Sequence, residues 1–241
     1  MTTFKRISIL LMIVIFAAAV LGAQSRNTNE ERTVEESYLQ EAIELMIIRE
    51  ISQAQSLDQK LLALEYIGEA IDRGNTGNEI RETLEFLSME GVTIQARENG
   101  RMVNNFPLAR REAAKYLGKI SSPEAQTALI NMCRYEPEPM VIQEAIKALG
   151  DCANENAEQA LQAIVFIVGR FNVLNPDNMM ALAAVDAIAK IADRNGIRDS
   201  GALILLLNIA DGPYIRPVKD KARTVLNDLR KANARQNVNN K

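Results

Sequence analysis

The stretch "RREAAKYLGKI", residues 110–120, combines small and aliphatic residues in an order that recurs along the chain. "IQEAIKALGDC" at residues 142–152 and "LAAVDAIAKIA" at residues 182–192 repeat that order. Apolar residues three and four positions apart are typical of a helix with one buried face. Small residues at fixed places allow neighbouring helices to approach closely. The stretch therefore predicts a helix that packs against copies of itself.

Five segments share the pattern of a leading Ala, an apolar fifth residue and usually a small residue at the end. They are "ALEYIG" ending at Gly68, "AAKYLG" at Gly118, "AIKALG" at Gly150, "AVDAIA" at Ala189 and "ARTVLN" at Asn227. The intervals between their ends are 50, 32, 39 and 38 residues. A turn and a second apolar stretch follow each of the first four segments. Helix pairs that recur at this spacing predict an all-α fold, an α-solenoid.

The three quoted stretches resemble HEAT-like repeats, whose first helix carries a basic residue ahead of an "A..ALG.I" core. The resemblance covers roughly residues 57–230 and is to repeat proteins of an exported bacterial type. It implies a right-handed α-solenoid of about four to five helix pairs that binds protein partners. We expect the repeat domain at residues 34–231, between a flexible lead-in at 24–33 and a basic polar tail at 232–241.

Two local signals favour particular helix boundaries. Ser122, Pro123 and Glu124 place a hydroxyl cap, a proline and an acid in the order expected at a helix start. The glycines that end the repeated segments suit a helix end closed by a residue in the left-handed conformation. The same glycines also suit close packing between stacked helices.

The segment "GVTIQARENGRMVNNFP", residues 91–107, reads as a β-hairpin inserted into the helical array. Asn99-Gly100 is the favoured pair for a type I′ turn. The insertion accounts for the long first interval, and insertions in solenoids often lie on the binding face. The alternative is that the hairpin folds over an edge of the first repeats through its apolar residues. Its candidate partner contacts are Arg97, Glu98, Asn99, Arg101, Asn104 and Asn105.

The second helix of each pair supplies another set of candidate contacts. In HEAT-like proteins these helices line the concave side, so the resemblance assigns partner binding to their polar residues. The candidates are Glu124, Gln126, Asn131, Arg134, Glu158, Gln162 and Arg170.

Charge is unevenly distributed along a chain whose net charge is −3. Residues 24–50 hold seven acids against three arginines, whereas residues 219–241 hold seven basic residues against two aspartates. The net acidity argues against a general nucleic-acid binder, which needs a basic face. The acidic head and basic tail favour head-to-tail self-association. A cell-wall or membrane-surface binder acting through the basic tail is an alternative.

The N-terminus has the order of a secretory signal peptide. Lys5 and Arg6 precede an apolar run from residue 7 to residue 20, and Leu21-Gly22-Ala23 offers a cleavage site after Ala23 or Gly22. We therefore expect an exported protein of the periplasm or cell envelope with a signal at residues 1–23. An uncleaved membrane anchor is the alternative.

The chain lacks the residues and motifs of common catalytic sites. It has no His, so the commonest general base and metal ligand are both absent. No G-x-S-x-G or P-loop motif occurs. We predict a non-catalytic scaffold or adaptor with no cofactor and no metal site. A small-molecule-binding or lyase-type HEAT-like enzyme is the alternative.

Cys133 and Cys152 are the only cysteines. On adjacent antiparallel helices they lie about 4 and 16 Å from the joint, at 1.5 Å per residue. That difference exceeds the ~7 Å Cα separation a disulfide allows. We predict two buried thiols, with a disulfide as the alternative.

Overall fold

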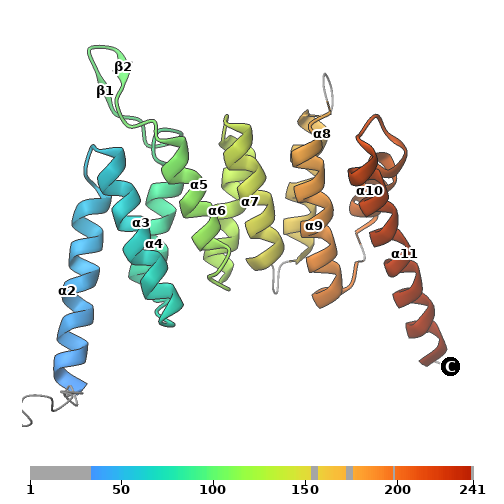
Figure 1. The fold of residues 1–241 in the computed structure, drawn as a ribbon, viewed down its shortest axis with the longest axis horizontal. Helices are drawn as coiled ribbons and strands as arrows, with labels where there is room; N and C mark the ends of the chain where they lie inside the picture. The colour runs from blue at the N-terminus through green and yellow to red at the C-terminus, as the bar shows by residue number, and fades with distance from the viewer. Residues whose placement is uncertain (1–33, 153–156, 172–175, 198, 240–241) are drawn as a thin grey trace, which may run out of the picture. The chain divides into compact units, whose positions relative to one another are not determined.

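The computed structural model describes residues 34–152, 157–171, 176–197 and 199–239 (Figure 1). The chain divides into two units, residues 1–42 and 43–241. Of the first unit, the structure describes the beginning of helix α2 (Val34–Ser52). The predicted signal peptide and lead-in lie outside the described residues.

Within the described residues the protein consists of ten helices and one two-stranded hairpin. After α2 the helices are α3 (Leu57–Asp72), α4 (Asn78–Met89), α5 (Pro107–Leu117), α6 (Pro123–Tyr135), α7 (Pro139–Cys152), α8 (Ala157–Phe171), α9 (Asn178–Asn195), α10 (Ser200–Asp211) and α11 (Arg216–Asn239). The prediction of an all-α solenoid is confirmed. Helix α11 also extends beyond residue 231, through most of the segment predicted to be a polar tail.

The helices of the second unit form two layers. Helices α3, α5, α7, α9 and α11 pack side by side as the first helices of their pairs, and α4, α6, α8 and α10 do the same as the second helices (Figure 1). Aliphatic side chains from both layers, such as Ile67, Leu117 and Ile164, are fully buried between them. One continuous core therefore runs through the array.

Side-chain caps set several helix starts. Ser122 accepts a hydrogen bond from the backbone N–H of Ala125 at 3.1 Å, and Pro123 occupies the first turn of α6, as predicted. Asp177 caps α9 by accepting from the N–H groups of Met179 and Met180. These caps satisfy backbone donors that the first turn of a helix leaves unpaired.

The repeated glycines set the distance between first helices. A Cβ added to Gly118 would lie 2.9 Å from the Cα of Ala148 on the next first helix. A Cβ on Gly150 would lie 2.7 Å from the Cα of Ala187. In each case the sixth residue of one segment contacts the fourth residue of the next. The stack therefore keeps one register from α5 to α9.

The prediction of left-handed helix ends at these glycines is wrong. Gly118 has a φ of −62°, and neither Gly68 nor Gly150 has a positive φ. All three keep ordinary helical backbone. At Gly118 and Gly150 the backbone of a neighbouring helix lies too close for a side chain, whereas a Cβ at Gly68 would meet the side chain of Tyr116.

The two cysteines are buried and are not joined. Burial raises the pKa of the Cys133 thiol to about 12. The Cys152 pKa is also raised by burial, and its Sγ donates to the carbonyl of Ile120 at 3.1 Å. The prediction of two buried thiols is confirmed.

Gly150→Ala is predicted to lower the free energy of unfolding by about 1 kcal/mol or more, because the new methyl group overpacks the α7–α9 contact. The control is Gly169→Ala on α8, where an added Cβ would meet nothing within 4 Å. That variant should gain about 0.5–1 kcal/mol from helix propensity. Urea unfolding measures both changes. Equal effects of the two substitutions would contradict the packing role of Gly150.

Candidate partner-binding surface

The hairpin forms where the sequence predicts it. Strands β1 (Arg97–Glu98) and β2 (Arg101–Met102) pair antiparallel, with Arg97 opposite Met102. Asn99 and Gly100 have φ values of 50° and 80°. A type I′ turn needs positive φ at both central positions, which Asn and Gly adopt at low cost. The predicted turn is therefore confirmed.

Asn104 closes the base of the hairpin rather than pointing to solvent. Its Oδ1 accepts from the backbone N–H of Ala96 at 2.8 Å, and its Nδ2 donates to the carbonyl of Ile94 at 2.7 Å. The side chain is buried. Sequence reasoning placed Asn104 among the partner contacts; the structure gives it an internal role because both ends of its amide are used within the hairpin.

A buried lysine lies beneath the hairpin. The Nζ of Lys60 on α3 is 2.7 Å from Oε2 of Glu90 and donates to the carbonyl of Ser52 at 2.8 Å. The same ammonium group lies 5.6 Å from the ring centroid of Phe86 and 5.8 Å from that of Phe106. The Lys60 side chain has no exposed surface. A buried charge requires such partners, so these contacts connect α3 with both ends of the insertion.

A second buried ion pair holds the other side of the insertion. Arg110 on α5 donates from Nε and Nη2 to the two carboxylate oxygens of Glu136, at 2.7 and 2.9 Å. Its Nη1 donates to Oδ1 of Asn105 at 2.9 Å and to the carbonyl of Glu90 at 3.2 Å. Loss of one partner from such a pair typically costs about 3–5 kcal/mol. We name the four charged residues Lys60, Glu90, Arg110 and Glu136 the buried network.

The buried network was missed in the sequence, although a signal for it exists. Lys60 lies four residues before Leu64 on the apolar stripe of α3, and Arg110 lies seven residues before Leu117 on that of α5. A charged residue at a core position needs a buried partner. The partners themselves are not indicated by spacing, since Arg110 and Glu136 lie 26 residues apart.

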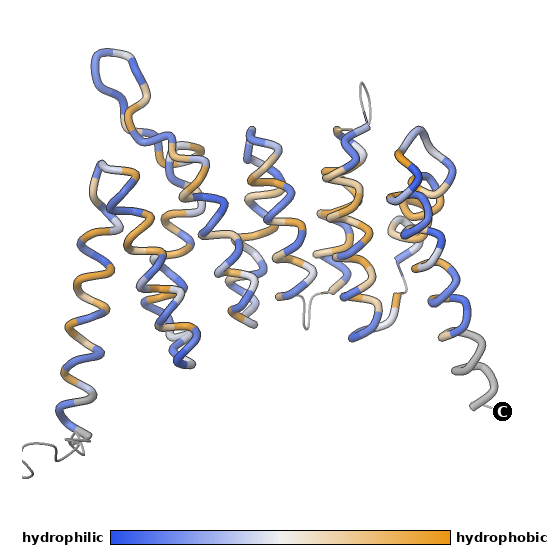
Figure 2. Tube along the Cα trace, viewed as in Figure 1, coloured by the Kyte–Doolittle hydropathy of each residue, from blue (hydrophilic) through white to orange (hydrophobic). Residues whose placement is uncertain are grey.

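The base and the tip of the hairpin differ in burial. Its base is fastened to the array, and Phe106 packs against the core. Its tip, residues 95–101, is exposed and mostly hydrophilic, and it extends beyond the helix ends (Figures 1 and 2). The tip therefore exposes four of the predicted contacts to solvent, while its base is held by hydrogen bonds. They are Arg97, Glu98, Asn99 and Arg101. Asn105 is exposed but directs its side-chain oxygen back to Arg110.

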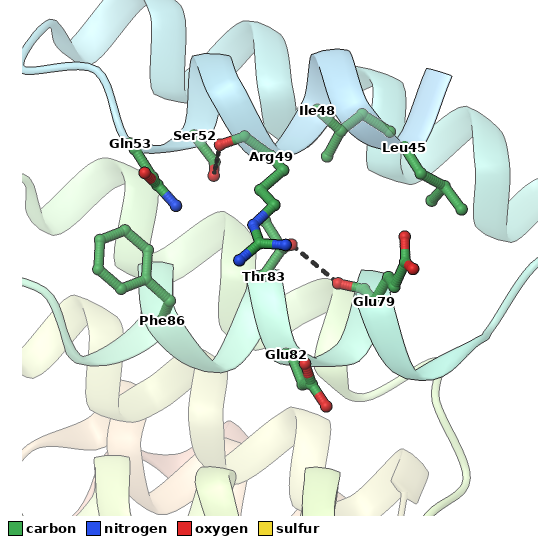
Figure 3. A pocket seen from close by; sticks show the side chains of 9 residues that line it. All are labelled: Leu45, Ile48, Arg49, Ser52, Gln53, Glu79, Glu82, Thr83 and Phe86. Atoms are coloured by element: carbon green, nitrogen blue, oxygen red, sulfur yellow. Dashed lines mark hydrogen bonds between the residues drawn. The ribbon is translucent and has the colours of Figure 1, made fainter. Parts of the chain in front are cut away.

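Among the described residues, cavities lie between α2 and α4, between α4 and α6, and between α6 and α8. A cavity of about 200 Å³ between α2 and α4 is lined by Leu45, Arg49, Glu79 and Phe86, among others (Figure 3). An open groove of about 560 Å³ lies between α4 and α6 and reaches the hairpin base at Thr93 and Ile94. A third, of about 470 Å³, lies between α6 and α8. The second helices thus form a grooved surface that is continuous with the hairpin.

Among the predicted contacts on the second helices, the acidic residues lie at the helix starts and the basic residues at the helix ends. Glu124 and Glu158 are exposed at the starts of α6 and α8, and Arg134 and Arg170 are exposed at the ends of the same helices. Hydrogen bonds from its own backbone N–H and from Ser122 lower the pKa of Glu124. Acids near the start and bases near the end complement the helix dipole. Gln126, also predicted as a contact, is buried.

Hydrogen bonds join two pairs of the predicted contacts on the second helices, within the described residues. Arg170 donates from Nη1 to the carbonyl of Arg134 at 3.3 Å. Glu158 accepts a hydrogen bond from Gln162 on its own helix. Glu124 lines the groove between α4 and α6.

Two aromatic residues on this surface were missed in the sequence. Tyr135 and Phe166 are each 59% exposed and line the groove between α6 and α8. Phe166 follows Glu158 and Gln162 at intervals of four residues, so it lies on the polar face of α8. An aromatic residue on a polar stripe is a signal for an interaction surface.

Other kinds of site are not apparent in the part of the chain that the structure describes. Within those ranges no three acidic, His or Cys side chains gather as metal ligands. The helices of these ranges were also tested for length and hydropathy, and none of them could span a membrane.

A family model for HEAT repeats matches residues 101–165, from β2 through most of α8. These residues contain two first helices and two second helices of the array, including the Gly118–Ala148 contact. The matched residues are therefore HEAT-like repeats, and the ten described helices are consistent with a HEAT-like repeat protein. A search for relatives among curated proteins found no match.

Proposed function

We propose that this HEAT-like protein is a non-catalytic scaffold or adaptor that binds protein partners through its second helices and its inserted hairpin. HEAT repeats generally mediate contacts between proteins. The observation that supports this function most strongly is the row of grooves that continues into the rigidly mounted hairpin. A surface of this kind fits an extended partner rather than a small substrate.

The openness of the grooves and the mixed charges that line them favour a scaffold over an enzyme. A lyase-type site needs convergent polar groups in an enclosed pocket. The two larger grooves are open, and that between α4 and α6 mixes Arg81 with Glu82, Glu85 and Glu124. The buried side chains of Lys60 and Arg110 form ion pairs with Glu90 and Glu136 within the fold.

We propose the cell envelope as the place of action. This proposal is based on the order of charged, apolar and small residues at positions 5–23. The polar tip of the hairpin and the many exposed charges of the second helices are compatible with an aqueous compartment outside the cytoplasm.

Site-specific photo-crosslinking in cells tests the binding surface. A photo-reactive residue would replace Arg97 at the hairpin tip or Gln162 on α8, and the control would replace Lys147, exposed on the first helix α7. We expect Arg97 and Gln162 positions to capture the same partner, identified by mass spectrometry, and Lys147 not to capture it. Capture of that partner from Lys147 alone, or of none from Gln162, would contradict the proposal.

A second proposal is head-to-tail self-association. Residues 34–72 hold nine acids and two basic residues, while residues 216–239 hold seven basic residues and two acids. Met46, at 72% exposure, and Ile47 lie exposed on α2 beside the acids. Sedimentation of the purified protein should show association at low salt that is lost at high salt. A monomer under both conditions would reject it.

A further inference from the structure

Two exposed arginines lie together where α6 and α8 end. The guanidinium of Arg170 donates one N–H to the backbone carbonyl of Arg134, at 3.3 Å. Arg134 and Arg170 each lie in the last turn of their helix, where the negative end of the helix dipole stabilises a positive charge. The Arg170 side chain therefore reaches from the end of α8 to the backbone at the end of α6, where Arg134 is also exposed.

Neither of these arginines forms an ion pair with a carboxylate in the described ranges. Most other exposed basic residues do: Arg73 pairs with Glu44, Lys119 with Asp72 and Lys190 with Asp151. In a chain of net charge −3, two adjacent unpaired arginines are a local excess of positive charge. Both side chains are exposed, and a carboxylate is the acceptor that matches a guanidinium group best.

An apolar groove lies beside this positive charge. Arg134, Gln162 and Ala163 line it together with the exposed rings of Tyr135 and Phe166. Its volume of about 470 Å³ is enough for one or two aliphatic side chains. Burial of the two rings under a partner would remove apolar surface from water.

The charge around the groove limits what can occupy it. Glu124 and Glu158 are exposed at the opposite ends of the same two helices. A nucleic acid or an anionic membrane would bring many negative charges over this surface and meet those glutamates. A single carboxylate flanked by apolar side chains meets only the two arginines and the aromatic rings.

We propose that the groove between α6 and α8 is the docking site for a partner segment in which an acidic side chain is next to an aliphatic one. The carboxylate accepts hydrogen bonds from Arg134 and Arg170, and the aliphatic side chain packs between Tyr135 and Phe166. This inference rests on the proposed scaffold function and specifies the chemistry of the partner.

A synthetic peptide array tests the chemistry directly with the purified protein as the probe. Each peptide carries Glu, Gln, Lys or phosphoserine at the centre, flanked by Leu or by Ser. We expect Glu flanked by Leu to be bound about 10- to 100-fold more tightly than Gln flanked by Leu, because a charge-assisted hydrogen bond is replaced by a neutral one. Glu flanked by Ser should also bind more weakly.

Substitutions test whether the peptide binds in the groove between α6 and α8. The protein with both Arg134→Glu and Arg170→Glu should no longer prefer peptides with a central Glu. The Phe166→Ala protein should no longer prefer peptides in which Leu flanks the central residue. The control, Lys147→Glu with Arg230→Glu, makes the same charge change on the first helices α7 and α11 and should bind as the unaltered protein does. Circular dichroism during heating checks that each variant is folded.

Several results would overturn the inference. They are equal binding of Glu and Gln peptides, binding of no peptide, preference for phosphoserine or Lys, and loss of binding in the control variant alone. If the photo-crosslinked partner is still captured from position 162 by the Arg134→Glu, Arg170→Glu protein, the scaffold function stands and this inference fails. If crosslinking captures no partner at all, the proposed function itself fails.

Discussion

A buried arginine–glutamate pair holds the inserted hairpin to the repeat array. Arg110 binds Glu136 through two hydrogen bonds and reaches Asn105 and the carbonyl of Glu90 with its third nitrogen. Glu90 in turn binds Lys60. Four charges in the core are tolerated only because each has a partner, so the geometry of the whole region is fixed by them. The hairpin is thus part of the rigid array at its base and free only at its tip.

The other constraint is the contact between small residues of successive first helices. Gly118 against Ala148 and Gly150 against Ala187 bring α5, α7 and α9 close together in one register. Because each helix pair has the same relation to the next, the second helices also follow one another in a row. Their starts carry Glu124 and Glu158 and their ends carry Arg134 and Arg170. The packing of the first helices therefore sets the spacing at which the charged residues of the second helices follow one another.

Periodicity predicts the helices and the turn residues predict the hairpin, since both depend on local chemistry. The five Ala-led segments lie on α3, α5, α7, α9 and α11, and Asn99-Gly100 forms the predicted turn. Of the two roles predicted for the glycines, close packing is confirmed and the left-handed helix end is wrong, because a glycine after an apolar helical run is compatible with either. Asn104 was taken as a surface residue since its two bonds to Ala96 and Ile94 depend on how the hairpin closes. The pairing of Arg110 with Glu136 depends on how whole helices stack.

The most direct test of this account is the free energy of unfolding of the Glu136→Gln protein in urea, compared with Glu144→Gln. Glu136→Gln leaves the buried charge of Arg110 without its counter-charge, and we predict a loss of about 3–5 kcal/mol. Glu144→Gln removes a surface pair with Lys147, 3.2 Å away, and should change stability by less than about 1 kcal/mol. If the two variants unfold with the same free energy, the buried network does not hold the array together and the account is wrong.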